Sequence, residues 1–323
     1  MAVNANTNET YEVSTIREDL QDALISISPT DTPFMTAAGR RNIDNTFFEW
    51  GVVSLAATDT SNRVAEGEAS PGNDAPTNAV RQGNYAQISD KVVEVSDTAN
   101  AVNGAGDAQT LAKQIAYKLK EMKRDMESML LDNVAASAGS SGTARQTAGL
   151  PAWLKTNADR GTGGADGTTS GTGDAGYPGA AATDGTQREL TEALLKSVIA
   201  SCWEEGAEPS IVMVGALAKQ KISTFDGNAT RFKEAEDSKI NAAVDIYISD
   251  FGELQIVPNR FQRGRDVFVL DPSYARVGYL KNTTQTELAR TGHSERRLIS
   301  AEYGLQVDNE AAHGIIADID PSL

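Results

Sequence analysis

The chain has 323 residues, 40% of them apolar and 23% charged, and its formal net charge is −16 at pH 7. This length can bury one large core or two smaller ones. The negative charge argues against a dedicated nucleic-acid binder, because such proteins gain affinity by neutralising phosphates. The single cysteine, Cys202, excludes an internal disulfide framework and fits a reducing compartment.

The chain also carries no sequence signal for a membrane. No stretch approaches the ~20 consecutive apolar residues that cross a bilayer. Residues 1–11 are polar and contain neither the basic nor the apolar part of a secretory signal. We therefore expect no membrane partner.

Residues 1–10 are predicted to form a flexible arm that leads into a short helix. Thr15 and Glu18 have the spacing of a capping box, and Pro29 and Pro33 end the helical pattern. One face of this helix is apolar and holds Ile16, Leu20, Ala23 and Leu24.

An extended β-hairpin is predicted next. Residues 47–55 are aromatic and β-branched, residues 88–95 alternate between apolar and polar, and residues 56–84 between them are polar. We expect the two strands to pair, with the polar stretch as a long tip. A compact domain rarely contains so long an unstructured connection unless it is functional.

A long helix is predicted over residues 107–136, which contain neither proline nor glycine. At ~1.5 Å per residue it would be roughly 40–45 Å long. Lysines and arginines on its other faces fit either an ordinary solvated surface or a local basic surface that faces DNA. The candidates for the DNA-facing role are Lys113, Lys120 and Arg124. The apolar stripe holds Ile115, Leu119, Met122, Met126 and Met129.

Residues 137–186 are rich in small and polar residues and are predicted to be a long flexible loop with an apolar island at 150–154. Residues 171–176 formally match G-x-G-x-x-G. No strand precedes the match and no apolar helix directly follows it, so a dinucleotide site is not expected.

The rest of the chain predicts an α+β region with helices packed on a mostly antiparallel sheet. The first helix would begin at a capping box formed by Thr186 and Glu189 and end at Gly206, with Cys202 on its apolar side. A second, short helix is predicted over residues 216–225. The predicted strands cover residues 211–214, 244–249, 253–257, 267–270, 276–280, 298–307 and 314–319.

Side chains that carry chemistry are few. With two histidines, His293 and His313, and one cysteine, the chain cannot assemble a Cys/His zinc site. Both histidines and Cys202 are interpreted as structural or surface residues. Neither a Gly-x-Ser-x-Gly elbow nor a Walker motif is present. The acidic groups at 204–205 and 234–237 read as solvated faces.

A Ca²⁺ site formed by Asp159, Asp166 and Asp174 is conceivable, but these residues lack the usual ligand order. We therefore predict no catalytic residue, no cofactor and no metal, and a protein that is not an enzyme.

Several phrases in fixed order carry a resemblance to a known family. They are REDLQD at 17–22, ISPTDTPF at 27–34, IYISDFG at 246–252, IVPNR at 256–260, VLDP at 269–272 and EYGLQVDN at 302–309. In these phrases the chain resembles the major capsid proteins of tailed bacteriophages, which have the Hong Kong 97-type fold. It is most similar to the major head proteins of the group typified by phage SU10.

The resemblance implies a domain plan for nearly the whole chain. The ranges are an N-terminal arm at 1–45, an extended loop at 46–98, a peripheral domain at 99–186 with a spine helix at 106–136, an axial domain at 187–290, and return strands of the peripheral domain at 291–323. In such proteins axial domains meet at the centres of capsomers, while arms and extended loops reach across neighbouring subunits.

The resemblance further implies a structural protein that is assembled in the host cytoplasm and resides in the virion. Copies of the chain would form hexamers and pentamers of an icosahedral head that contacts packaged DNA weakly and non-specifically. Cement, scaffolding and portal proteins are possible partners. Arg63, Glu66 and Glu68 are candidate inter-subunit contacts. Lys91 lies near the base of the hairpin rather than at its tip, so covalent crosslinking is not expected.

Two alternatives stay open at this point. The same fold also builds encapsulin-like compartments that hold cargo enzymes. The acidic, glycine-rich β content would suit a virion- or tail-associated surface binding module, which would be a stable monomer.

Overall fold

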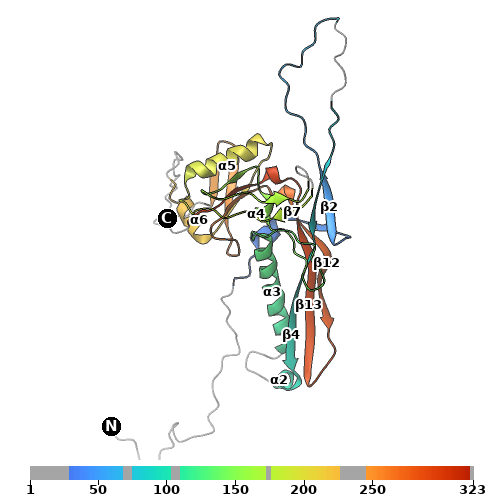
Figure 1. Ribbon diagram of the computed structural model, residues 1–323. Helices are drawn as coiled ribbons and strands as arrows, with labels where there is room; N and C mark the ends of the chain where they lie inside the picture. The colour runs from blue at the N-terminus through green and yellow to red at the C-terminus, as the bar shows by residue number, and fades with distance from the viewer. Residues whose placement is uncertain (1–28, 68–74, 103–109, 172–175, 226–244, 321–323) are drawn as a thin grey trace, which may run out of the picture.

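The computed structural model describes residues 29–67, 75–102, 110–171, 176–225 and 245–320. The predicted arm helix, with Thr15 and Glu18, therefore lies outside the described residues. Two sheets organise the chain, and Figure 1 shows an elongated part built around α3 (Thr110–Leu130) beside a compact part carrying α5 (Glu192–Glu204) and α6 (Ala216–Ile222).

The elongated part is a four-stranded sheet in the order β1-β12-β13-β4. The long strands β12 (Ala275–Glu287) and β13 (Ser294–Val307) are antiparallel, and β1 (Gly39–Asn42) runs parallel to β12 at one edge. At the other edge, β4 (Gln87–Ser96) lies beside α3 (Figure 1). An ion pair joins them, with Lys91 Nζ 2.6 Å from Asp125 Oδ2.

The compact part is a six-stranded mixed sheet in the order β5-β14-β11-β8-β10-β9. Three neighbouring pairs are antiparallel and two are parallel, so the prediction of a mostly antiparallel sheet is confirmed. Helices α5 and α6 pack their apolar sides on one face of this sheet. Its strands are β5 (Ala158–Asp159), β8 (Ile211–Val214), β9 (Ile246–Ser249), β10 (Gly252–Pro258), β11 (Val267–Leu270) and β14 (Gly314–Ile316).

The predicted hairpin exists, but the prediction of its second strand is wrong. β2 (Phe47–Val52) pairs with β3 (Val80–Tyr85), and all of β3 except Tyr85 lies in the stretch 56–84 predicted to be an unstructured tip. Residues 88–95 instead belong to β4 and pair with β13, more than two hundred residues away in the chain. Gly83 weakens the strand pattern of β3, yet a Cβ there would lie 2.7 Å from the ring of Phe47, so the close packing requires glycine.

The long helix ends earlier than predicted. Its described part, α3, has 21 residues and ends at Leu130 rather than near Ala136, while the predicted first turn at 107–109 lies outside the described residues. The predicted stripe does face the core: Met122 and Met126 are buried, and Ile115 and Leu119 pack against the same cluster. The sequence did not reveal that Glu127, directly after Met126, is completely buried.

Within residues 137–186, the described segments are packed rather than loose. Ala148, Leu150 and Leu154 have almost no exposed surface and join the core under α3. Gly149 permits this contact, because a Cβ there would lie 1.9 Å from the carbonyl oxygen of Asp132 just beyond the end of α3. The segment contains α4 (Leu150–Trp153), β6 (Thr168–Thr169) and β7 (Pro178–Ala180).

The boundary of α5 also corrects the prediction. Its N-cap is Thr191, whose hydroxyl accepts a hydrogen bond from the Leu194 N–H, so Thr186 and Glu189 precede the helix. The apolar side expected around Cys202 is buried against the sheet. The second helix, α6, ends at Ile222 rather than at Phe225. The remaining elements are α1 (Pro33–Ala37), α2 (Asp97–Ala101), η1 (Pro272–Tyr274) and η2 (Glu310–Ala312).

Sheet membership cuts across the predicted domain boundaries. β12 lies within the predicted axial range but belongs to the elongated sheet, and β14 lies within the predicted return strands but belongs to the compact sheet. Among the described residues, no helix is long and apolar enough to cross a membrane.

Candidate functional site

The most extended feature is the loop that the β2–β3 hairpin carries. Residues 53–67 and 75–79 contain no helix or strand and run away from the rest of the molecule (Figure 1). Three aliphatic side chains in this loop face water: Leu55 is 85% exposed, Val64 57% and Val53 56%. Exposed apolar side chains gathered on a protruding segment indicate a surface that is buried against another chain.

The charged contacts predicted in this loop are only partly visible. Arg63 and Glu66 are exposed, and Glu68 lies outside the described residues. Their role between subunits therefore stays a prediction. Sequence reasoning missed Val53, Leu55 and Val64, because isolated aliphatic residues in a polar stretch look ordinary until their exposure is known.

A second apolar surface lies at the edge of the compact sheet. The edge strand β9 exposes Ile246 and Ile248 to 58% and 72%. At the β9–β10 turn, the ring of Phe251 lies 5.1 Å from that of Trp203 at the end of α5, and both rings are about half exposed.

The predicted DNA-facing cations lie along α3 in different environments. Lys120 is exposed, whereas Lys113 and Arg124 are half-buried. The Arg124 guanidinium lies 5.6 Å from the centre of the Phe261 ring, which is a cation–π contact. Contact of these three residues with DNA stays a prediction.

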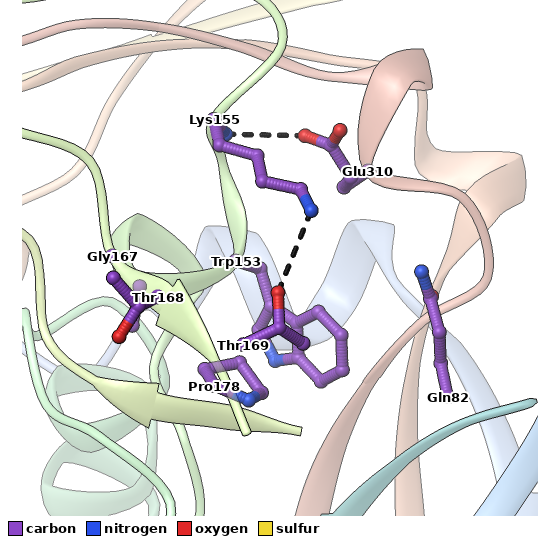
Figure 2. A pocket seen from close by; sticks show the side chains of 9 residues that line it. Gln82, Trp153, Lys155, Gly167, Thr168, Thr169, Pro178 and Glu310 are labelled. Atoms are coloured by element: carbon purple, nitrogen blue, oxygen red, sulfur yellow. Dashed lines mark hydrogen bonds between the residues drawn. The ribbon is translucent and has the colours of Figure 1, made fainter. Parts of the chain in front are cut away.

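One enclosed cavity, seen in Figure 2, lies where α4, β3 and the β6–β7 pair meet. Its volume is about 10 Å³, which holds a single water molecule and no substrate. The Lys155 N–H donates to Glu310 (3.1 Å), and the Lys155 ammonium lies 3.5 Å from the Thr169 hydroxyl (Figure 2). Gln82 Oε1 and Trp153 Nε1 are buried without a protein partner, so a bound water would suit them. We therefore interpret the cavity as part of the packing between these elements and not as a binding site.

The candidate reactive residues have structural environments. Burial raises the pKa of the Cys202 thiol to about 12, so it is not ionised at neutral pH. His313 is completely buried, and burial lowers its pKa to about 4. His313 Nδ1 accepts a hydrogen bond from the Asp271 N–H (3.3 Å).

The three aspartates of the conceivable Ca²⁺ site do not form one in the part of the chain that the structure describes. Asp159 pairs with Arg188, Asp166 pairs with Arg160, and Asp174 lies outside the described residues. Each visible carboxylate is therefore neutralised by its own arginine. The described residues contain no group of three or more His, Cys, Asp or Glu side chains that could hold a metal ion.

Comparison with known proteins identifies the family to which the chain belongs. The model of the family described as SU10 major capsid protein matches residues 3–320, nearly the whole chain. The chain belongs to the SU10 major capsid protein family. This confirms the resemblance that the sequence phrases carried, and the protein is a structural subunit of a phage capsid.

Individual relatives agree with the family match. The chain is 28% identical to the major capsid protein of Escherichia phage Phieco32 over 90% of each chain. Among solved structures, it is similar to the Cyanophage A-1(L) capsid asymmetric unit, with a TM-score of 0.63 and 13% identity over 96% of this chain and 98% of that one. The holo-SrpI encapsulin complex of Synechococcus elongatus PCC 7942 gives a TM-score of 0.55 and 13% identity over 93% of each chain. The predicted α+β capsid fold is confirmed.

Proposed function

We propose that this capsid protein forms hexamers and pentamers that close into an icosahedral head around the double-stranded DNA genome of the phage. The observation that carries the proposal is the protruding β2–β3 loop with Val53, Leu55 and Val64 exposed to water. A loop that buries these side chains on a neighbour makes a head-to-tail contact, and such contacts close into rings when their rotation permits. Many weak contacts of this kind stabilise a shell by avidity.

The domain plan belongs to the same proposal. The arm (1–45) and the extended loop (46–98) reach neighbouring subunits. The peripheral domain (99–186 and 291–323) forms the wall around α3, with β12 in its sheet, and the axial domain (187–290) meets its copies around the capsomer axis, with β14 in its sheet. The exposed Trp203–Phe251 pair and β9, all within the axial range, supply apolar surface for such contacts.

Contacts with DNA and with other virion proteins are proposed only in general form. A net charge of −16 rules out a uniformly basic inner wall, so attraction to DNA must be local. Lys113, Lys120 and Arg124 on α3 are our candidates for it. Assembly in the host cytoplasm, with scaffolding, cement and portal proteins as partners, completes the proposal.

Negative-stain microscopy of the purified protein tests the proposal. We expect closed isometric particles, or capsomer rings that convert into them when the concentration is raised. Two results together would contradict self-assembly through the loop. The native protein would stay monomeric at high concentration, and Leu55→Asp would sediment with the same coefficient as the native protein. Such a monomer would instead favour a surface binding module.

An encapsulin-like compartment is the second candidate, because the fold is also similar to the SrpI encapsulin. The two functions differ in what the shell contains. Particles purified from infected cells should contain double-stranded DNA that resists nuclease until the shell is opened. Particles that contain a protein cargo and no nucleic acid would favour the compartment.

A further inference from the structure

The three acidic residues of α3 each have a partner of their own. Glu121 forms an ion pair with Lys118 on the same helix, and Asp125 forms one with Lys91 on β4. Glu127 is buried and accepts hydrogen bonds from the backbone of α1. These carboxylates are therefore already engaged and do not neutralise the other cations of the helix.

Cations without an acidic partner gather beside this helix. Within the described part of the chain, Lys120, Lys123 and Arg124 of α3 form no ion pair, and neither does Arg40 of β1. Spacings of three and four residues place Lys120, Lys123 and Arg124 next to one another on the helix surface. In a chain with a net charge of −16, this concentration of unpaired positive charge makes a local surface of the opposite sign.

A groove of about 550 Å³ lies where α1, α3 and β12 meet. Its charged lining residues are Arg40 and Lys123, and none of the described residues that line it is acidic. Apolar and aromatic surface is supplied by Met35, Met126 and Tyr279, and polar groups by Asn282 and three threonines. The groove therefore combines two positive charges with apolar surface and uncharged hydrogen-bonding groups.

Contacts within the chain hold the two cations on the groove. The Arg40 guanidinium lies 4.6 Å from the centre of the Tyr279 ring, which is a cation–π contact on a side chain only 8% exposed. The hydrogen bonds from α1 to Glu127 fix α1, which directly precedes β1, against α3. Arg40 and Lys123 therefore line one groove from two elements that are joined by a buried contact. An oriented charge loses little freedom when it binds an anion.

We propose that this groove binds the sugar–phosphate backbone of packaged DNA, with Arg40 and Lys123 contacting a phosphate. The inference rests on the proposed enclosure of DNA by the shell, and it adds these two residues to the candidate DNA contacts. The planar guanidinium of Arg40 presents paired donors to phosphate oxygens, and Lys123 adds a second charge. Since only the backbone is contacted, binding is independent of base sequence.

The arrangement of the cations favours a nucleic acid over a single acidic side chain. Lys120 and Arg124 continue the positive surface along α3 beyond the groove. A DNA strand carries one phosphate per ~3.4 Å of helix axis, so one ligand can engage several of these cations at once. A lone carboxylate would use one of them, and it would leave the apolar surface of Met35 and Met126 without a contact.

DNA binding by the unassembled full chain tests the proposal. A labelled short duplex of mixed sequence is titrated at about 50 mM salt and followed by fluorescence anisotropy. The groove variant combines Arg40→Gln with Lys123→Gln. The control combines Arg290→Gln with Lys196→Gln, which removes the same charge from side chains that are both 54% exposed and lie in other parts of the fold.

We expect the groove variant to bind the duplex about tenfold or more weakly, and the control to differ by about twofold at most. The slope of log affinity against log salt should also become shallower by about two in the groove variant, since two phosphate contacts are lost. Equal affinities in the groove variant and the control would overturn the proposal. Tighter binding of an oligoglutamate peptide than of the duplex, lost in the groove variant, would overturn it too, because the groove would then take an acidic protein segment.

This outcome is separate from that of the proposed function, because free subunits are measured. Normal shells from a protein whose groove variant still binds DNA fully would contradict the groove alone. Full DNA binding by a protein that never forms shells would contradict the proposed head alone.

A second measurement uses the native protein and needs no substitution. Its lysines are acetylated with limiting reagent in the presence and absence of the duplex, and the modified sites are identified by mass spectrometry. DNA should slow the acetylation of Lys123 several-fold and leave that of Lys196 on α5 unchanged, because Lys196 lies away from the groove. Acetylation of Lys123 at the same rate with and without DNA would overturn the proposal.

Discussion

Glu127 connects three segments at a single buried carboxylate. The backbone N–H groups of Phe34 and Met35 donate to it at 2.7 and 2.9 Å, and the Asn259 amide donates at 2.7 Å. These donors come from α1, 93 and 92 residues away, and from the chain following β10, 132 residues away. Burial raises the pKa of Glu127, and the hydrogen bonds from Met35, Phe34 and Asn259 oppose that rise.

Replacing this carboxylate should therefore be costly. Glu127→Leu leaves three buried donors without an acceptor, and we expect the free energy of unfolding to fall by about 3 kcal/mol or more. Urea denaturation of the unassembled protein measures the change. The control is Glu121→Leu in the same helix, whose half-exposed carboxylate pairs with Lys118, and the expected loss there is below about 1 kcal/mol. Equal losses of unfolding free energy in the two variants would show that the hydrogen bonds to Glu127 do not stabilise the contact between these segments.

Two buried groups titrate in opposite senses. Burial raises the pKa of Asp266 to about 6 from 3.8, against the opposing influence of Arg263. Between these values only the folded chain keeps the proton, so this group makes stability fall as pH rises. Burial lowers the pKa of His313 to about 4 from 6.5. Here only the unfolded chain keeps the proton, so stability rises with pH and is lost as pH falls below about 6.5.

The pH ranges over which Asp266 and His313 affect stability overlap, and their contributions to the slope of stability against pH have opposite signs. The two contributions therefore nearly cancel in the native protein, and a variant that lacks one group should reveal the contribution of the other. Asp266→Asn should make stability rise with pH between about 4 and 6 by up to about 1.4 kcal/mol per pH unit more than in the native chain. His313→Gln should change the slope by a similar amount in the opposite direction. Urea midpoints at several pH values in this range give both slopes. Unchanged slopes in both variants would refute the assignment.

At the scale of elements, we expect a substitution in the β2–β3 loop to impair assembly without changing the stability of the folded chain. Leu55 is 85% exposed, so Leu55→Asp should alter the free energy of unfolding by less than about 0.5 kcal/mol. The same change should abolish closed particles, because it places a charge in the inter-subunit contact that we propose for the loop. Microscopy and thermal melting on the same preparation measure the two effects.

The charged contacts predicted in the same loop have their own test. Arg63→Glu reverses a charge eight residues from Leu55 in the sequence, and it should slow assembly if Arg63 meets an acidic partner on a neighbour. Unchanged shell assembly with Arg63→Glu, together with a loss in Leu55→Asp, would show that the loop contact is apolar.

The packed segment after α3 depends on Gly149. A Cβ there would lie 1.9 Å from the carbonyl oxygen of Asp132, so Gly149→Ala must push α4 away from the end of α3. We expect a loss of about 2–4 kcal/mol in the free energy of unfolding. Gly264→Ala is the control, because a Cβ at that position meets nothing within 4 Å.

For the whole molecule, the net charge of −16 opposes assembly, since every subunit repels its neighbours. Raising ionic strength from about 0.01 to 0.15 M shortens the screening length from about 30 to 8 Å. We therefore expect assembly to become faster over this range, as followed by light scattering. Slower assembly at higher salt would mean that attractive ion pairs between subunits outweigh the general repulsion.

Local patterns in the sequence determined several elements correctly. The absence of proline and glycine and a four-three apolar spacing predicted the core-facing side of α3. Short β-branched runs predicted β8 and β11, which lie in the sheet centre with both faces covered. Such features follow from interactions between residues close in the chain, so the sequence carries them directly.

Tertiary structure alone decided the strand partners and the buried charges. β2 pairs with β3 and not with β4, although β4 has an equally strand-like sequence. β4 instead pairs with β13 and packs against α3. In the sequence, Glu127 resembles any other charged residue on a helix. Its burial became evident only from its contacts with α1 and Asn259 in the folded chain. The exposure of the loop's aliphatic side chains also became known only from the tertiary structure. Pairing, burial and exposure depend on distant parts of the chain, and no local pattern records them.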